Sequence, residues 1–279
     1  MTHLKTIIIT VTIIFINSIT LLAQDRHFAW NYNSPTLTKG SVDVEVWNTY
    51  SFGRKNYHYS QFWNRLEFEF GVTNKIQTSF YINSKHRTIG PVESDTLNPS
   101  LGKTSSFSFS NAWKFYLLNR SIHAIGLSAY IEYYLGQGEI ELEAKVMIDK
   151  IIDKHWLVLN VTFEEEFEWE PEVETENGKS KVKIELEKET KLINEFGYMF
   201  HPKPSYGFGI EARNQSVFKE GKIEYSSLFI GPSVFFSQGK FFFTLNFMPQ
   251  IVNLAGENKP LELNDQEKYM YRAFIGMSL

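Results

Sequence analysis

Apolar and polar residues alternate along most of the chain after residue 40. In the segment 65–72, the even positions are Leu, Phe, Phe and Val, and the odd positions are Arg, Glu, Glu and Gly. Because successive side chains of a β-strand point to opposite faces, this period of two predicts strands with one apolar and one polar face. This pattern predicts twelve strands, at approximately 41–52, 61–72, 76–83, 106–117, 123–135, 139–149, 156–169, 181–200, 206–214, 224–236, 240–251 and 267–279.

Local propensity disagrees with this pattern in a few places. The segments 139–150 and 181–193 are rich in Glu, Leu and Lys, which favour helices. Their apolar residues still fall on alternate positions, whereas a helix would need them three or four apart, so strands are predicted. The alternation gives no reason for Pro232 and Pro249 inside strands, or for Asn111 on the apolar face.

The connectors alternate in length as well. Short links follow the even-numbered strands, at 73–75, 118–122, 150–155, 201–205 and 237–239. Longer links follow most odd-numbered strands, at 53–60, 84–105, 170–180, 215–223 and 252–266, with 136–138 as the exception. An even number of strands with short turns at one end and long loops at the other is typical of a transmembrane β-barrel whose termini lie on the periplasmic side.

The first 23 residues have the pattern of a secretory signal peptide. Lys5 precedes an apolar run that ends near Leu22, and the small residue Ala23 is followed by polar residues. Cleavage after Ala23 would leave 24–40 as a periplasmic N-terminal segment and 41–279 as the barrel. A retained membrane anchor is the alternative. A lipoprotein is excluded because the chain has no cysteine to acylate.

Alternation alone does not say which face meets water. In a soluble β-sandwich the apolar face would be buried, whereas in a membrane barrel it meets lipid and the polar face lines the lumen. Aromatic residues gather near the predicted strand ends, as at Tyr50, Trp63, Trp156 and Trp169, and the last strand reaches the end of the sequence. These features favour an all-β, antiparallel up-and-down transmembrane barrel, with an exported soluble β-protein as the alternative.

Composition excludes other classes. No apolar run of about 20 residues follows residue 22, which excludes a helical membrane protein. The absence of cysteine excludes a disulfide-stapled fold and a Cys-ligated zinc site. With 28 basic and 32 acidic residues, the chain is not predicted to bind nucleic acid by neutralising phosphates. Its 24 Phe, 14 Tyr and 6 Trp argue against disorder.

The polar face of the predicted barrel carries more acids than bases. The inward acids are Asp43, Glu45, Glu67, Glu69, Glu132, Glu139, Glu141, Glu143, Asp149, Glu164, Glu166, Glu168, Glu185, Glu187, Glu189, Glu195 and Glu211. The inward bases are Arg65, Lys114, Lys145, Lys183, Lys191, Arg213, Lys268 and Arg272. We predict that solute selectivity is set by Glu45, Arg65, Glu67, Glu69, Lys114, Glu132, Glu139, Glu141, Glu143, Lys145, Glu185, Glu187, Glu211, Arg213 and Arg272.

An acidic lumen supports two interpretations. Excess carboxylates in a narrow pore favour cations and repel anions. Alternatively, ion pairs close the lumen, because eight-stranded barrels are filled by side chains and sixteen-stranded barrels hold a channel. Twelve strands lie between these two cases.

Catalytic and metal-binding motifs are missing from the sequence. The seven histidines are never spaced as metal ligands, and those of the mature chain are expected in solvated turns and loops. The segment 207–212 imitates a dinucleotide fingerprint but lies inside an alternating strand. We predict no enzyme activity, catalytic residue, metal or cofactor. An outer-membrane hydrolase with a Ser–His pair is a weaker alternative, since neither His58 nor His86 falls in a predicted strand.

Four segments resemble a known group of proteins. They are LTKG at 37–40, GVTNKIQ at 71–77, EIELEAK at 139–145 and GIEARN at 209–214. Together they are similar to uncharacterised outer-membrane barrels of porin or transporter type, akin to the aromatic-compound transporter-like barrels of Gram-negative bacteria. The end of the signal, LLAQ, resembles exported proteins of the Bacteroidota. Such barrels usually end in an aromatic residue, whereas this chain ends in Leu279.

This resemblance implies an outer-membrane location, contact with membrane lipid and passive passage of small solutes, and the acidic lumen predicts that cations are among them. The alternative is a non-conducting barrel that serves as a subunit or scaffold of an envelope complex. In that case the loops 84–105, 170–180 and 252–266, or the N-terminal segment 24–40, would contact protein partners.

Overall fold

A computed structural model gives the structure of the protein and describes residues 26–55, 57–91, 102–176 and 179–279. The predicted signal peptide, 1–23, lies outside the described residues. Within the described part of the chain, no helix is long and apolar enough to cross a membrane.

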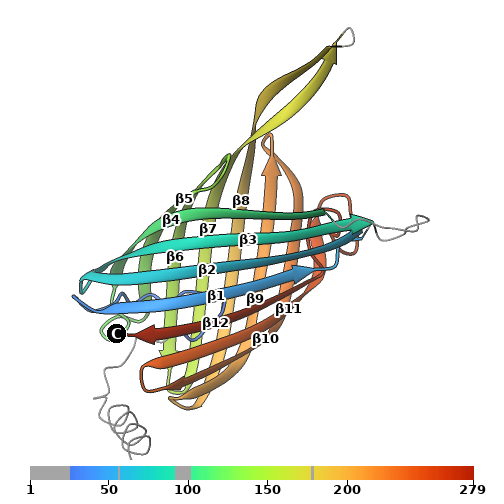
Figure 1. Ribbon diagram of the computed structural model, residues 1–279. Helices are drawn as coiled ribbons and strands as arrows, with labels where there is room; N and C mark the ends of the chain where they lie inside the picture. The colour runs from blue at the N-terminus through green and yellow to red at the C-terminus, as the bar shows by residue number, and fades with distance from the viewer. Residues whose placement is uncertain (1–25, 56, 92–101, 177–178) are drawn as a thin grey trace, which may run out of the picture.

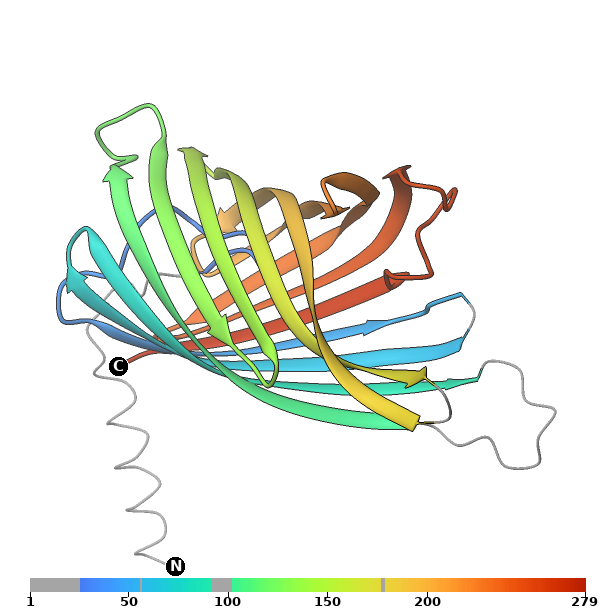
Figure 2. The same ribbon diagram turned by 90° about the horizontal axis from the view of Figure 1, so that it is seen from above.

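Twelve antiparallel strands form a closed barrel in which each strand pairs with the next and β1 pairs with β12 (Figures 1 and 2). The strands are β1 (Val42–Phe52), β2 (Tyr57–Thr73), β3 (Ile76–Pro91), β4 (Gly102–Leu118), β5 (Gly126–Leu135), β6 (Glu139–Ile152), β7 (His155–Glu176), β8 (Lys179–Lys203), β9 (Tyr206–Lys219), β10 (Lys222–Gln238), β11 (Phe241–Ala255) and β12 (Tyr269–Ser278). The predicted all-β up-and-down barrel and its strand count are confirmed.

Several strands are longer than predicted at the loop end. The predicted loop 170–180 is wrong, because β7 and β8 continue as a hairpin that stands beyond the rim of the barrel (Figure 1). The predicted loop 215–223 is also wrong, since only the turn at 220–221 separates β9 from β10. The extension beyond the prediction is mainly that of β7, whose predicted end was 169, because the predicted strand 181–200 already covered most of β8.

The outer surface of the barrel is apolar, as a lipid-facing surface requires. Large apolar side chains stand exposed around it, among them Phe80, Phe107 and Leu142. Asn111 lies on this face and is nevertheless buried. Its amide donates to Thr78 Oγ1 (3.1 Å) and to the Ser79 carbonyl (2.8 Å), and its oxygen accepts from the Trp113 indole (3.0 Å). These bonds satisfy a polar group that lipid could not.

Pro232 and Pro249, for which the alternation gave no reason, lie where the ladder is incomplete. Pro249 forms the last pair of the β11–β12 ladder, opposite Tyr269, so its missing N–H removes little. Pro232 lies in a gap of the β10–β11 ladder, between the pairs Phe229–Gln250 and Ser233–Asn246. The Asn246 side chain donates to the Pro232 carbonyl across this gap at 2.9 Å.

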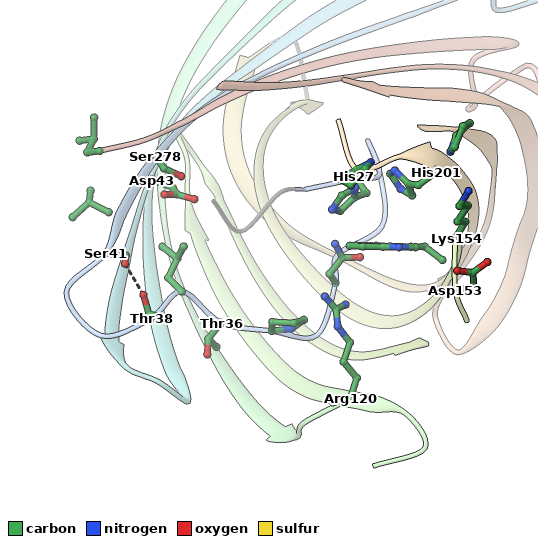
Figure 3. A pocket seen from close by; sticks show the side chains of 18 residues that line it. His27, Thr36, Thr38, Ser41, Asp43, Arg120, Asp153, Lys154, His201 and Ser278 are labelled. Atoms are coloured by element: carbon green, nitrogen blue, oxygen red, sulfur yellow. Dashed lines mark hydrogen bonds between the residues drawn. The ribbon is translucent and has the colours of Figure 1, made fainter. Parts of the chain in front are cut away.

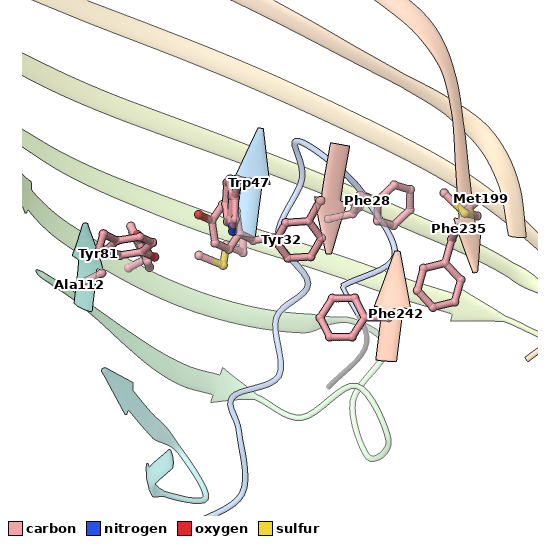
Figure 4. Packing of buried hydrophobic residues seen from close by; sticks show 12 residues of the cluster. Phe28, Tyr32, Trp47, Tyr81, Ala112, Met199, Phe235 and Phe242 are labelled. Carbon is pink, nitrogen blue, oxygen red and sulfur yellow. The ribbon is translucent and has the colours of Figure 1, made fainter. Parts of the chain in front are cut away.

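The described part of the N-terminal segment lies inside the barrel. Residues 26–37 are buried with one exception and form no strand. Phe28 and Tyr32 pack against Trp47, Phe242 and other aromatic residues of the inner wall (Figure 4). The prediction of a periplasmic segment at 24–40, free to meet partners, is therefore corrected for residues 26–37, which we call the lumen segment.

Candidate functional site

Glu211 of β9 anchors the middle of the lumen segment. Its buried carboxylate accepts hydrogen bonds from three consecutive backbone N–H groups, those of Ala29 (3.0 Å), Trp30 (2.9 Å) and Asn31 (3.2 Å). The Asn31 side chain (3.0 Å) and Ser233 Oγ (2.8 Å) also donate to it. The charge of Glu211 is thus stabilised by hydrogen-bond donors of the lumen segment and the wall. It is therefore not free to attract a solute.

Three further wall residues bind the backbone of the lumen segment. Asp149 of β6 accepts from the N–H and the hydroxyl of Ser34, both at 2.8 Å. Asn160 of β7 accepts from Tyr32 N (2.6 Å) and donates to Tyr32 O (3.0 Å). Gln77 of β3 accepts from the N–H of Leu37 at 2.9 Å. The lumen segment is therefore attached along its length to the polar face of the sheet.

Aromatic and cationic side chains stack in the centre of the lumen. The Trp30 indole donates to Asn246 at 3.0 Å, and the Arg272 guanidinium lies 3.4 Å above the centre of its ring. Arg26 is stacked in the same way on Tyr32 (3.5 Å) and Trp47 (3.8 Å). Such cation–π contacts are strongest when they are desolvated, as these are.

The lumen segment separates two cavities. The outer cavity, of about 250 Å³, lies on the loop side, and Trp30 and Tyr32 contribute to its lining. The inner cavity, of about 570 Å³, lies at the short-turn end and is lined by His27, His201 and Trp156, among others (Figure 3).

Ion pairs cover the wall of the outer cavity. Lys145 contacts Glu143 at 3.0 Å, and Lys191 contacts Glu164 at 2.7 Å. Arg65 pairs with Glu132, Arg213 pairs with Glu195, and Lys191 also pairs with Glu166. Seven carboxylates and six bases line this cavity, so its net charge is far smaller than the acidic surplus of the sequence suggests.

The structure divides the predicted selectivity residues into separate groups. The residues that line the outer cavity are Arg65, Glu132, Glu141, Glu143, Lys145, Arg213 and Arg272. Glu139 lies beside Lys85 at 3.4 Å. Glu45, Glu67, Glu69 and Lys114 are buried, with Arg26 in contact with the first two. Glu185 and Glu187 are exposed on the β7–β8 hairpin and lie apart from these groups.

Sequence reasoning missed the lumen segment and its partners. The stretch 27–34 contains three aromatic residues and no Asp, Glu, Lys or Arg, which is a poor composition for a solvated tail. Because this stretch does not alternate with a period of two, nothing in the sequence indicated that it packs against the strands. His27 and His201 were expected in solvent, yet both are 5% exposed and their ring centres lie 4.7 Å apart.

The closed sheet, with its apolar outer face and polar lumen, defines an outer-membrane type of β-barrel. A family profile described as a family of unknown function (DUF6662) matches residues 20–279, and the chain belongs to that family. No curated protein matches the chain.

Solved structures share the fold at low sequence identity. The COG4313 outer membrane channel from Pseudomonas putida F1 has a TM-score of 0.56 and 10% identity, and the match covers 88% of this chain and 98% of that chain. The translocator domain of the autotransporter NalP from Neisseria meningitidis has a TM-score of 0.60 and 8% identity, covering 85% and 88%. The β domain of the Bordetella autotransporter BrkA has a TM-score of 0.53 and 8% identity, covering 86% and 99%.

Proposed function

We propose that the protein is an outer-membrane channel for small solutes, exported by the signal at 1–23, whose conductance is set by the lumen segment. The observation that carries this proposal is the pair of cavities, one on each side of a segment held to the wall by hydrogen bonds and aromatic packing. Such bonds can be exchanged for bonds to water when the segment leaves, because each contributes only about 1 kcal/mol net. Neighbours of similar fold include a protein described as an outer membrane channel.

A modest preference for small cations belongs to this proposal. The outer cavity has one more carboxylate than bases in its lining, and Glu141 within it lies close to Glu143 and Glu164. Carboxylates in a narrow passage raise the local concentration of cations. Because most of these acids are paired, we expect a reversal potential shifted only weakly toward the cation potential.

Conductance in planar bilayers tests the channel. We expect small or infrequent steps from the mature protein, and larger, persistent steps from a variant that lacks residues 26–37. The matched control is Glu187→Gln, which changes an exposed residue of the β7–β8 hairpin and should conduct like the unmodified protein. Silent bilayers with the deletion variant, when its barrel is folded and inserted, would contradict the proposal.

A non-conducting scaffold is the second candidate, favoured by the filled centre of the lumen and by the β7–β8 hairpin beyond the rim. Silence of both proteins in bilayers would support it. We further propose that the protein is not an enzyme, and a lipase assay of detergent-solubilised protein tests that expectation.

A further inference from the structure

We propose that four acids on β1 and β2 form a binding site for one Ca²⁺ ion. This carboxylate cluster consists of Asp43, Glu45, Glu67 and Glu69. The site is independent of solute passage, and it would hold its ion whether or not the barrel conducts.

The sheet register brings the four acids together. Asp43 pairs with Glu69 and Glu45 pairs with Glu67 across neighbouring antiparallel strands, and all four face inward. One oxygen each from Asp43, Glu45 and Glu69 lies within 4.8 Å of the others. Calcium binds oxygen at about 2.4 Å, so ligands on opposite sides of the ion stand about 4.8 Å apart. The three oxygens are therefore spaced as ligands of one ion.

Glu67 is the acid of the cluster whose burial is least compensated. Its side chain is 0% exposed, and no donor lies in hydrogen-bonding geometry to either carboxylate oxygen. Its ion pair with Arg26 Nη1 is long, at 3.5 Å, and that same nitrogen lies closer to Glu45, at 3.0 Å. Asp43 Oδ2 is likewise buried without a hydrogen bond. Buried carboxylate oxygens without hydrogen bonds are costly, because desolvation is not fully compensated, and a bound cation would supply the compensation that Arg26 gives only in part.

The local charges leave room for a divalent ion. Two buried bases, Arg26 and Lys114, face the carboxylate cluster, and Gln77 donates a hydrogen bond of 2.8 Å to Glu69. Four carboxylates against two bases leave two negative charges, which one divalent cation neutralises.

A route to the site exists from the short-turn end. Asp43 contributes to the lining of the inner cavity and lies beside Ser278 there (Figure 3). The ligands are carboxylates on two neighbouring strands. Ca²⁺ accepts six to eight oxygens in flexible geometry, whereas Mg²⁺ requires a near-ideal octahedron and keeps its waters. Ca²⁺ is therefore the expected occupant.

Isothermal titration of the full mature protein in detergent with CaCl₂ tests the site. We expect one Ca²⁺ per chain, at least tenfold weaker binding of Mg²⁺, and at least tenfold weaker Ca²⁺ binding by Glu67→Gln. The matched control is Glu143→Gln, which alters an acid of the outer cavity and should bind Ca²⁺ like the unmodified protein.

Thermal unfolding provides a second readout that does not depend on the heat of binding. Ca²⁺ should raise the midpoint of the unmodified protein and of Glu143→Gln, and leave that of Glu67→Gln unchanged. The proposal is overturned if the unmodified protein binds no Ca²⁺, which would mean that protons neutralise the cluster. Equal affinity for Mg²⁺, or undiminished binding by a folded Glu67→Gln, would also overturn it.

Discussion

Individual polar residues of the lumen have two different tasks. Glu211 and Asp149 bind backbone N–H groups of the lumen segment, whereas Glu143 and Glu164 form ion pairs on the wall of the outer cavity. All four are acids on the inward face of their strands. The two pairs differ in whether the lumen segment contacts them. For this reason, the surplus of inward acids in the sequence does not correspond to a single function.

We expect His27 to make attachment of the lumen segment sensitive to pH. Its ring packs on Trp156 (3.8 Å) and Phe235 (4.2 Å), and burial, with smaller contributions from His201 and Arg120, holds its pKa well below the usual 6.5. A lowered pKa in the attached state means that this state favours the neutral ring. This stabilisation of the attached state is complete above about pH 6.5 and is lost as the pH falls below that value. The equilibrium constant for attachment then falls by up to about tenfold per pH unit.

Hydrogen exchange of residues 28–34 at pH 7.5 and 5.5, corrected for intrinsic rates, measures this effect. We expect lower protection at pH 5.5, and protection that changes much less with pH in His27→Phe. Equal protection at both pH values in the unmodified protein would contradict the role of His27.

At the scale of elements, the sequence predicted the strands whose two faces meet different environments. All twelve strands were predictable because lipid on one side and polar groups on the other enforce a period of two. The end of β7 beyond residue 169 was not, because residues 170–176 include four glutamates and one proline and offer little apolar alternation. The lumen segment was not predictable either, because an irregular chain surrounded by the wall has no periodicity to detect.

The β7–β8 hairpin beyond the rim should be dispensable for the barrel. The β6–β7 ladder ends at Glu168 and the β8–β9 ladder begins at Glu189, so the strand segments between these residues pair only with each other. We expect that replacing residues 171–184 by Asn-Gly changes the free energy of unfolding by no more than about 0.5 kcal/mol. Urea unfolding of the barrel in lipid vesicles measures this free energy. A barrel that no longer folds would show that the hairpin is required for assembly.

For the whole molecule, the proposed channel function implies a second state of the barrel, in which the lumen segment has left the lumen. In the described state, it fills the centre and leaves cavities of about 570 and 250 Å³ at the two ends. If transport requires the segment to leave, the open probability of the barrel and the exposure of the segment are set by the same release equilibrium. If solutes pass beside a stationary segment, the two quantities are independent.

A single change at Glu211 distinguishes these mechanisms. Glu211→Gln replaces a charged acceptor of several hydrogen bonds by a neutral amide, and we expect it to weaken attachment by about 2 kcal/mol, or roughly thirtyfold. Because the chain has no cysteine, Ser34→Cys, at a buried position of the lumen segment, reports exposure through its rate of reaction with a maleimide. In the Ser34→Cys background, Glu211→Gln should raise the labelling rate and the open probability in bilayers by the same factor, while Glu187→Gln should change neither. Faster labelling without a change in conductance would mean that release of the segment does not open the barrel, since a shared equilibrium forces both to move together.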